Sequence, residues 1–344
     1  MLDSTPSVGL LHGAGYVGGE LVRLLHGHPA VTLAAVTSRT FAGQPLHTSH
    51  AHLRGRIEGS FIAPEDLDLS AVDALVIAAE HGRTMHLVPE VRDAGFDGPI
   101  VDLSSDFRFA TPDAYEAANE KPHAAPEHIA AAHYRLPEVT GPLPSAARLV
   151  ANPGCFATAL TLALAPLAAQ DVPFTASITA LTGASGSGAS PSAATHFPDR
   201  DGNVRAYKVL RHRHAPEVVQ AVGDHVQVDF VPVSGPWTRG IWGTAQITWP
   251  APIDADTVSG WFHDAYADAP LVRCSPGSLP ELKPVARTPF ADVGWTVRGQ
   301  TLVVGVALDN LLKGAASQAI QNLNHVLGLP DALGLLPTAT VPTP

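Results

Sequence analysis

Short apolar runs alternate with segments of helical spacing in the first part of the chain. The runs at 7–12, 31–37, 74–79 and 100–103 are bounded by turn residues, which is typical of buried parallel strands. A segment of helical spacing at 20–26 separates the first two runs. The pattern predicts a βαβ unit within an open α/β sheet.

The pattern changes to a period of two in the second half of the chain. Apolar and polar residues alternate along 226–231, 241–248 and 301–307, which predicts an antiparallel sheet with one covered face. The apolar spacing at 310–327 then predicts one long helix, which we expect to pack back on the first domain.

Two domains follow from these patterns and from the length of 344 residues. The predicted fold class is α/β. We expect a Rossmann-type dinucleotide-binding domain of residues 1–154 plus 311–344, with an inserted α+β domain of residues 155–310 for substrate binding and oligomerisation, built on a mainly antiparallel sheet. Sheets of this kind often pair subunits, so we expect a homo-oligomer, either a dimer or a tetramer.

Composition excludes several classes of function. The formal net charge of −11 argues against a nucleic-acid surface, which needs clustered basic residues. The most apolar run, 156–169, contains Pro166 and is shorter than the roughly 20 residues of a membrane span. The first residues lack the basic and apolar regions of a signal peptide. We therefore expect a cytoplasmic enzyme that binds neither nucleic acid nor membrane.

A glycine motif follows the first predicted strand. Gly13, Gly15 and Gly18, with Tyr16 and Val17 between them, form a G-x-G-x-x-G turn that opens a helix. Such glycines allow a tight turn and close approach of a pyrophosphate to the amides of the helix start. The motif alone is also compatible with an ordinary glycine-rich turn.

The end of the second predicted strand favours NADPH over NADH. Ser38 and Arg39 stand where a carboxylate would otherwise hold the ribose 2′-hydroxyl. Hydroxyl and guanidinium groups suit a 2′-phosphate, which a carboxylate would repel. The alternative is that Arg39 is a solvated loop residue.

Cys155 is the candidate nucleophile. It follows the turn at 151–154 and begins an apolar helical stretch, and a helix N-terminus stabilises thiolate over thiol. The alternative is a structural cysteine that packs as a small apolar residue. Cys274 has no such setting, and two cysteines in a long chain without export signals do not predict a disulfide framework.

The segment at 211–217 supplies the candidate base. His212 or His214 would move the proton, while Arg211 could bind an anion. Glu217 could hold the imidazole in one tautomer, as the third member of a triad does. A solvated basic segment is the alternative, and no metal-ligand spacing is present that would predict a metal site.

Two further segments are candidate anion cradles. Ser185 and Gly186 lie in a run of small residues at 183–188 that offers amides and hydroxyls. Arg108 ends a segment at 102–108 and provides a potential bidentate contact. Either segment could be an ordinary loop, but with a thiol and a dinucleotide fold they favour a phosphate-bearing substrate.

Together these segments resemble the N-acetyl-γ-glutamyl-phosphate reductases and their lysine-pathway relatives, which share a fold with aspartate-semialdehyde dehydrogenases. The resemblance covers nearly the whole chain. It rests on residues 13–18, 37–39 with 42–43, 101–108, 136–138, 152–155, 212–217 and 309–315. One departure is Glu80, which stands where the family usually has proline.

The resemblance implies a reaction and roles for residues. Cys155 would attack an acyl phosphate and form a thioester that NADPH reduces to a semialdehyde, with His214 as acid/base. Cofactor contacts are implied for Ser185, Gly186 and Asn310, near the nicotinamide. Contacts with the substrate are implied for Arg108, Asn152, Arg211 and Lys313.

Two branches of the family share this chemistry. One reduces N-acetyl-γ-glutamyl phosphate for arginine, and the other reduces aminoadipate 6-phosphate on a small acidic carrier protein of the LysW type for lysine. The segments at 196–208 and 290–294 are more similar to the lysine branch, and the basic residues near 200–213 suit an acidic carrier, so this branch is favoured. The same basic residues suit a small phosphorylated substrate.

Rival functions remain at this stage. A non-phosphorylating aldehyde dehydrogenase and an aspartate-semialdehyde dehydrogenase are the nearest oxidoreductases. A dinucleotide-binding regulator without catalysis is the alternative from another class, and Cys155 together with the region of His214 argues against it.

Overall fold

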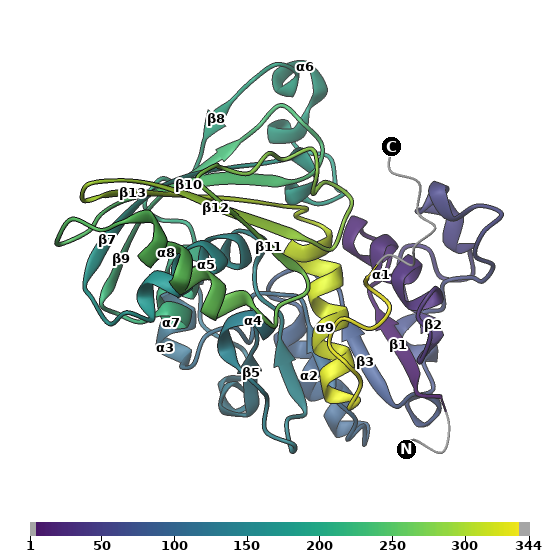
Figure 1. Cartoon of the computed structure of the whole chain (residues 1–344). Helices are drawn as coiled ribbons and strands as arrows, with labels where there is room; N and C mark the ends of the chain where they lie inside the picture. The colour runs from purple at the N-terminus through teal and green to yellow at the C-terminus, as the bar shows by residue number, and fades with distance from the viewer. Residues whose placement is uncertain (1–4, 337–344) are drawn as a thin grey trace. The chain divides into compact units, whose positions relative to one another are not determined.

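A computed structural model describes residues 5–336 and divides the chain into two compact units (Figure 1). The first unit comprises Met1–Pro137, Pro142–Pro153 and Ala315–Pro344, and the second comprises Glu138–Gly141 and Gly154–Gly314. Relative to the predicted division, residues 138–141, 154 and 311–314 belong with the inserted unit.

The first unit contains a six-stranded sheet of order β2-β1-β3-β4-β6-β5, in which all neighbouring strands are parallel. This confirms the predicted open α/β sheet. The strands are β1 (Ser7–Leu11), β2 (Thr32–Val36), β3 (Ala74–Ile77), β4 (Ile100–Asp102), β5 (Ala132–Tyr134) and β6 (Leu149–Ala151).

Within the described residues, three helices of the first unit lie between its strands in the sequence, and a fourth lies near the end of the chain. They are α1 (Tyr16–His26), α2 (Thr84–Asp93), α3 (Pro112–Asn119) and α9 (Ser317–Val326). Helix α1 begins four residues earlier than the apolar spacing predicted, because its N-cap is Gly15 within the glycine turn. Helix α9 packs against α1, β3 and β4, so the end of the chain completes this unit.

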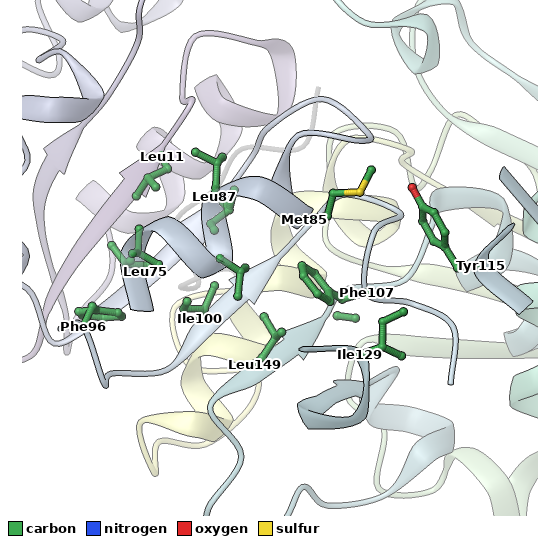
Figure 2. Close-up of a cluster of buried hydrophobic side chains, with 14 of the residues drawn as sticks. Leu11, Leu75, Met85, Leu87, Phe96, Ile100, Phe107, Tyr115, Ile129 and Leu149 are labelled. Atoms are coloured by element: carbon green, nitrogen blue, oxygen red, sulfur yellow. The ribbon is translucent and has the colours of Figure 1, made fainter. Parts of the chain in front are cut away.

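An apolar cluster fills the space between α2 and strands β1, β3, β4 and β6 (Figure 2). Leu75 and Ile100 contribute from neighbouring strands, Met85 and Leu87 from α2, and Phe107 from the segment after β4. All five side chains are buried. Strands β3 and β4 are buried at every position, which matches the continuous apolar runs in the sequence.

The second unit contains a seven-stranded mixed sheet of order β11-β12-β13-β10-β7-β9-β8. The pairs β7–β9 and β11–β12 are parallel and the other neighbours are antiparallel. Alternating apolar and polar residues indicate that one face of a strand is covered, but they do not indicate the direction of its neighbour. The sequence therefore did not predict the two parallel pairs. The strands are β7 (Phe174–Thr182), β8 (Arg205–Ala206), β9 (Val226–Ser234), β10 (Ile241–Thr248), β11 (Val272–Pro276), β12 (Ala291–Arg298) and β13 (Thr301–Leu308).

Helices cover one face of this sheet. Helix α5 packs against β10, β12 and β13 and against helices α7 and α8. The opposite face exposes Thr175, Ser177, Gln246 and Thr248 of β7 and β10. In chain order, the helices from α4 to α8 are α4 (Pro137–Thr140), α5 (Cys155–Ala168), α6 (Phe197–Arg200), α7 (His214–Val222) and α8 (Ala255–Tyr266).

The predicted helix at 310–327 is interrupted. A π-helical turn, Leu312–Ala316, precedes α9. Asp309 causes the change: its backbone carbonyl accepts from Gly314 N, five residues on, at 2.9 Å, and its side chain accepts from the amides of Leu311 and Leu312. Single π-helical turns frequently occur at functional sites.

Candidate functional site

The turn between β1 and α1 has the geometry of an anion cradle. A Cβ on Gly18 would overlap the carbonyl of Gly13, so the first turn of α1 packs closely on the end of β1. A Cβ on Gly15 would meet no described atom within 4 Å. Gly15 is the N-cap and provides no side-chain acceptor for the first amides of α1, which is the arrangement that an anion can use. Exposed Tyr16 and half-buried Val17 follow at the helix start.

The end of β2 carries hydroxyl and guanidinium groups. Ser38 is buried, and its Oγ accepts from the amide of Phe41 at 3.2 Å. Arg39 is exposed. Burial, then the charges of Arg83 and Arg39, lower the pKa of His12 at the end of β1, so both guanidiniums act on this turn. The positive charge beside the open space at Gly15 fits a phosphorylated dinucleotide.

Arg83 was not singled out from the sequence. It follows Gly82 and is the N-cap of α2, and its amide donates to the carbonyl of Glu80 at 3.1 Å. Glu80 itself is exposed. The signal that could have indicated Arg83 is its place after the third parallel strand, at the same sheet edge as the glycine turn.

Cys155 is the first residue of α5. Its N-cap, Gly154, donates its amide to Oε1 of Glu217 at 2.7 Å, and Glu217 is 1% exposed. Helix α7, which carries Glu217, packs against α5. The sequence suggested Glu217 as a partner of an imidazole, and the structure shows that it holds the loop before the thiol.

The two cysteines differ in their surroundings. Cys155 is half-buried at a helix start, whereas Cys274 lies on β11 and is exposed. Partial enclosure of the Cys274 thiol, together with the nearby carboxylate of Asp292, raises the pKa of that thiol to about 11. A protonated thiol is a poor nucleophile, so Cys274 is unsuited to catalysis.

His212 and His214 form an aromatic cluster beside α5. Their ring centroids are 4.6 Å apart, and both rings contact Phe156, the residue after Cys155. Nδ1 of His212 accepts from the amide of His214 at 3.2 Å. Burial, followed by the charges of Arg213 and Lys208, lowers the pKa of His212 to about 4. His212 is therefore neutral near pH 7, which leaves His214 as the candidate acid/base.

Tyr207 is a residue that sequence reasoning missed. Its ring contacts His212 edge-on at 5.7 Å. Burial, followed by the charge of Cys155, raises the pKa of the Tyr207 phenol, so its hydroxyl stays protonated. A tyrosine within the same basic segment as His212 was the available signal. It offers a hydrogen-bond donor near the thiol.

Asn310 and Ser185, predicted as cofactor contacts, meet in the second unit. Nδ2 of Asn310 donates to Oγ of Ser185 at 3.0 Å, and Oδ1 of Asn310 accepts from the amide of Gly240 at 2.6 Å. Both side chains are buried, while Gly186 is exposed beside them. The contacts fix Asn310 at the start of the loop that leads to Lys313.

Asp309 and Arg239 anchor the same loop. The Arg239 guanidinium donates twice to the buried Asp309 carboxylate, from Nε at 2.9 Å and from Nη2 at 3.0 Å. The carboxylate also accepts from the amide of Arg287 at 2.6 Å. Neither residue was predicted as a site residue, because the pair joins positions 70 residues apart.

Lys313 is fully buried and forms an ion pair with Glu138 at 2.6 Å. The ammonium group is enclosed and engaged in this pair, and its contact with the substrate stays a prediction. A Cβ on the next residue, Gly314, would lie 2.8 Å from Cβ of Cys155. The pair thus holds the π-helical turn whose glycine contacts the nucleophile.

Arg108 and Asn152 are buried within the first unit. Nε and Nη2 of Arg108 donate to the carbonyls of Asn152 and Leu103, both at 2.8 Å. The Asn152 side chain donates to the carbonyl of Ala315 and accepts from Asn322. These contacts organise the carboxyl ends of β4 and β6, whereas Arg211, the remaining predicted substrate contact, is exposed.

Residues 5–336 contain neither a candidate metal site nor a candidate membrane span. No group of three His, Cys, Asp or Glu side chains is arranged to hold a metal ion, and no helix there is both long and apolar enough to cross a bilayer.

Comparison with protein families assigns both units. Residues 7–143 match the semialdehyde dehydrogenase NAD binding domain, and residues 155–310 match the semialdehyde dehydrogenase dimerisation domain.

Curated relatives and solved structures agree with these matches. The N-acetyl-gamma-glutamyl-phosphate reductases of Methanothrix thermoacetophila and Symbiobacterium thermophilum are 38% and 40% identical, over 95% and 96% of this chain and 97% and 98% of theirs. Aspartate semialdehyde dehydrogenase II of Vibrio cholerae has a TM-score of 0.72 at 17% identity, over 95% of this chain and 99% of that chain. The Candida albicans aspartate semialdehyde dehydrogenase with NADP has a TM-score of 0.69 at 13% identity, over 94% and 99%.

Proposed function

Because the chain belongs to the semialdehyde dehydrogenase family, we propose that it is an NADPH-dependent reductase of N-acetyl-γ-glutamyl phosphate. Relatives of that name match nearly the whole chain, which supports a shared reaction as well as a shared fold. The observation that carries the proposal is Cys155 at the first position of α5, on a loop held by Glu217 and beside the ring of Phe156 and the histidines.

In the proposed reaction the Cys155 thiolate attacks the acyl carbon. The bond from that carbon to the phosphate oxygen breaks, inorganic phosphate leaves, and a thioester remains on sulfur. NADPH, when bound, supplies the hydride that reduces the thioester carbon. The carbonyl of the semialdehyde then re-forms as the carbon–sulfur bond breaks, and the thiolate is regenerated. The helix start favours that thiolate throughout.

His214 is proposed to take up the proton of the Cys155 thiol. Support comes from its neighbour His212, which is a weak base near pH 7 because its pKa is lowered to about 4 and its Nδ1 already accepts from the amide of His214. The protonated phenol of Tyr207 adds a donor for negative charge that develops near the thiol.

NADPH is the proposed cofactor because of the side chains after β2. Arg39 and Arg83 bring positive charge to the glycine turn, and no carboxylate stands beside Ser38 in the sequence to repel a 2′-phosphate. Ser185 and Asn310 are the proposed contacts near the nicotinamide. We also propose a homo-oligomer, in keeping with the dimerisation-domain match and the uncovered sheet face.

A second candidate substrate is aminoadipate 6-phosphate on an acidic carrier protein. The observation in its favour is a group of basic side chains within one exposed segment of an otherwise acidic chain. Arg205, Lys208 and Arg211 are exposed there, and Arg200 is half-exposed. Such a surface would attract an acidic carrier. The named relatives support the N-acetyl-γ-glutamyl compound, which is therefore the leading proposal.

The test is a steady-state assay of NADPH oxidation with each acyl phosphate, with and without the carrier protein. Efficient reduction of free N-acetyl-γ-glutamyl phosphate supports the proposal, and turnover that requires the carrier replaces it with the second candidate. No oxidation with either compound would contradict both. In reverse, oxidation of the semialdehyde should require inorganic phosphate, which a non-phosphorylating aldehyde dehydrogenase would not.

A further inference from the structure

A pocket of about 160 Å³ lies between the segment that carries α6 and β8 and the end of β9. Figure 1 shows α6 and β8 in this segment. A water occupies about 30 Å³ in the liquid, so the pocket has room for a carboxylate or a phosphate group with its hydration. Its lining consists of Ala193, Ala194, Asp199, Arg200, Asn203, Arg205 and Ser234. We call it the Arg200–Arg205 pocket.

Arg200 is held in a defined orientation in this pocket. Its Nη2 donates to the carbonyl of Gly235 at 2.6 Å. Its Nε is shielded from solvent and has no hydrogen-bond partner. A shielded donor without an acceptor is costly, so the Arg200 side chain is arranged for an acceptor that the described residues do not provide.

The charge of the pocket is not neutralised within the described part of the chain. Neither Arg200 nor Arg205 forms an ion pair there. The Asp199 carboxylate, which also lines the pocket, lies 3.0 Å from His196 Nδ1, so the lining holds two guanidiniums and one carboxylate. Burial, followed by the charge of Arg205, lowers the pKa of Arg200. The two guanidiniums repel each other, and an anion between them would stabilise both. They form a local positive site in a chain of net charge −11.

The pocket adjoins the proposed reaction site. Tyr207 lies within electrostatic range of both Cys155 and Arg200. Its ring also contacts His212, the neighbour of His214. A group bound beside Arg200 would therefore share one neighbouring side chain, Tyr207, with the Cys155 site.

We propose that the Arg200–Arg205 pocket is a second anion subsite, which binds a carboxylate of the ligand apart from the acyl phosphate that reacts at Cys155. The identity of the ligand rests on the proposed acyl-phosphate reductase function. The affinity of the pocket for a carboxylate is independent of that function. The same chemistry has two sources: a carboxylate of a free small substrate, or an acidic side chain of a polypeptide that carries it.

Calorimetric titration of the full-length protein tests the subsite with two probes, glutarate for the free source and tetraglutamate for the polypeptide source. Wild type should bind at least one probe, and Arg205→Gln should weaken that binding by about tenfold or more, the scale of a charge-assisted contact. Arg205→Lys should retain part of it. Arg298→Gln, which removes an exposed guanidinium at the end of β12, is the matched control and should bind as wild type does.

The outcomes separate the subsite from the function. If Arg205→Gln and wild type bind the probes equally, or if wild type binds neither, the subsite is wrong, whatever the enzyme reduces. If binding depends on Arg205 but neither acyl phosphate is reduced, the subsite stands and the proposed function fails. Arg200→Gln gives a second measurement of the subsite and should weaken the same probe.

Discussion

The amide of Gly154 and the carboxylate of Glu217 are joined by a hydrogen bond of 2.7 Å, although the residues are 63 positions apart in the sequence. Glu217 lies one turn into α7, and Gly154 is the N-cap of α5. The bond therefore fixes the residue directly before Cys155 to the helix that begins with His214. The segments that carry the candidate nucleophile and the candidate base are thus held together by one hydrogen bond.

Removal of the Glu217 carboxylate should destabilise this arrangement. Glu217→Ala leaves the Gly154 amide buried without an acceptor, which costs about 1–3 kcal/mol in the free energy of unfolding. Glu217→Gln keeps an acceptor oxygen and should lose less. Denaturant titration of both variants measures the difference. Equal stability of Glu217→Ala and wild type would show that the hydrogen bond contributes nothing.

Cys155→Ser should abolish NADPH-dependent reduction and leave the fold intact, because a hydroxyl is far harder to deprotonate near neutral pH than a thiol. Cys274→Ser should keep wild-type activity. Alkylation at pH 7 should modify Cys155 first, since the pKa of Cys274 is raised to about 11. Substantial turnover by Cys155→Ser would rule out the thioester route.

His214→Asn should lower kcat by a factor of about 10²–10⁴, the usual scale of acid/base assistance, with little change in KM. The pH dependence of kcat should also lose one ionisation. His212 is the control position, because its pKa of about 4 keeps it neutral through the range of the assay. A His214→Asn variant that loses affinity and keeps kcat would assign the residue to binding.

The free energy of unfolding should fall between about pH 7 and pH 4 because of His212. Burial, followed by Arg213 and Lys208, lowers its pKa from 6.5 to about 4 in the folded state. Below pH 6.5 the unfolded chain therefore binds a proton that the folded chain does not, and the loss amounts to roughly 3 kcal/mol in all.

The check on His212 is denaturant titration at several pH values. His212→Asn should show a shallower decline than wild type, and His263→Asn, at an exposed position of α8, should follow wild type. An unchanged slope in His212→Asn would mean that this imidazole titrates normally in the folded protein.

Arg39→Ala should raise KM for NADPH by roughly ten- to a hundredfold and leave KM for NADH nearly unchanged, as expected for one charge-assisted contact with the 2′-phosphate. Binding of 2′,5′-ADP compared with AMP gives the same contrast without catalysis. Arg83→Ala is informative beside it, since Arg83 also acts on the turn. Equal effects on both cofactors would remove Arg39 from this role.

Local patterns predicted a large part of the molecule. Alternation along 241–248 gave the bounds of β10, and the continuous apolar run at 74–79 gave β3 within two residues. Cys155 at a helix start followed from the turn before it. Each of these features depends on neighbours in the sequence, which is why the sequence contains the signal.

Features that depend on distant partners were not predictable in this way. The ion pair of Lys313 with Glu138 joins residues 175 positions apart, so no local pattern in the sequence indicated that Lys313 also supports the π-helical turn. Arg108, predicted to bind the substrate, also donates to the carbonyls of Asn152 and Leu103. The sequence does not show whether an Arg or Lys side chain contacts a ligand, a carboxylate or a backbone carbonyl.

The position of α9 has a consequence for synthesis on the ribosome. This helix packs against α1, β3 and β4, yet it is made about 290 residues after α1 ends. At roughly 5–20 residues per second, the first parallel strands wait about 15–60 s for the helix that covers them. The inserted unit is translated completely in the interval and has its own core to form. A chain that ends before residue 317 would lack α9. The first unit, although it is made first, would then be the unit that cannot complete its folding.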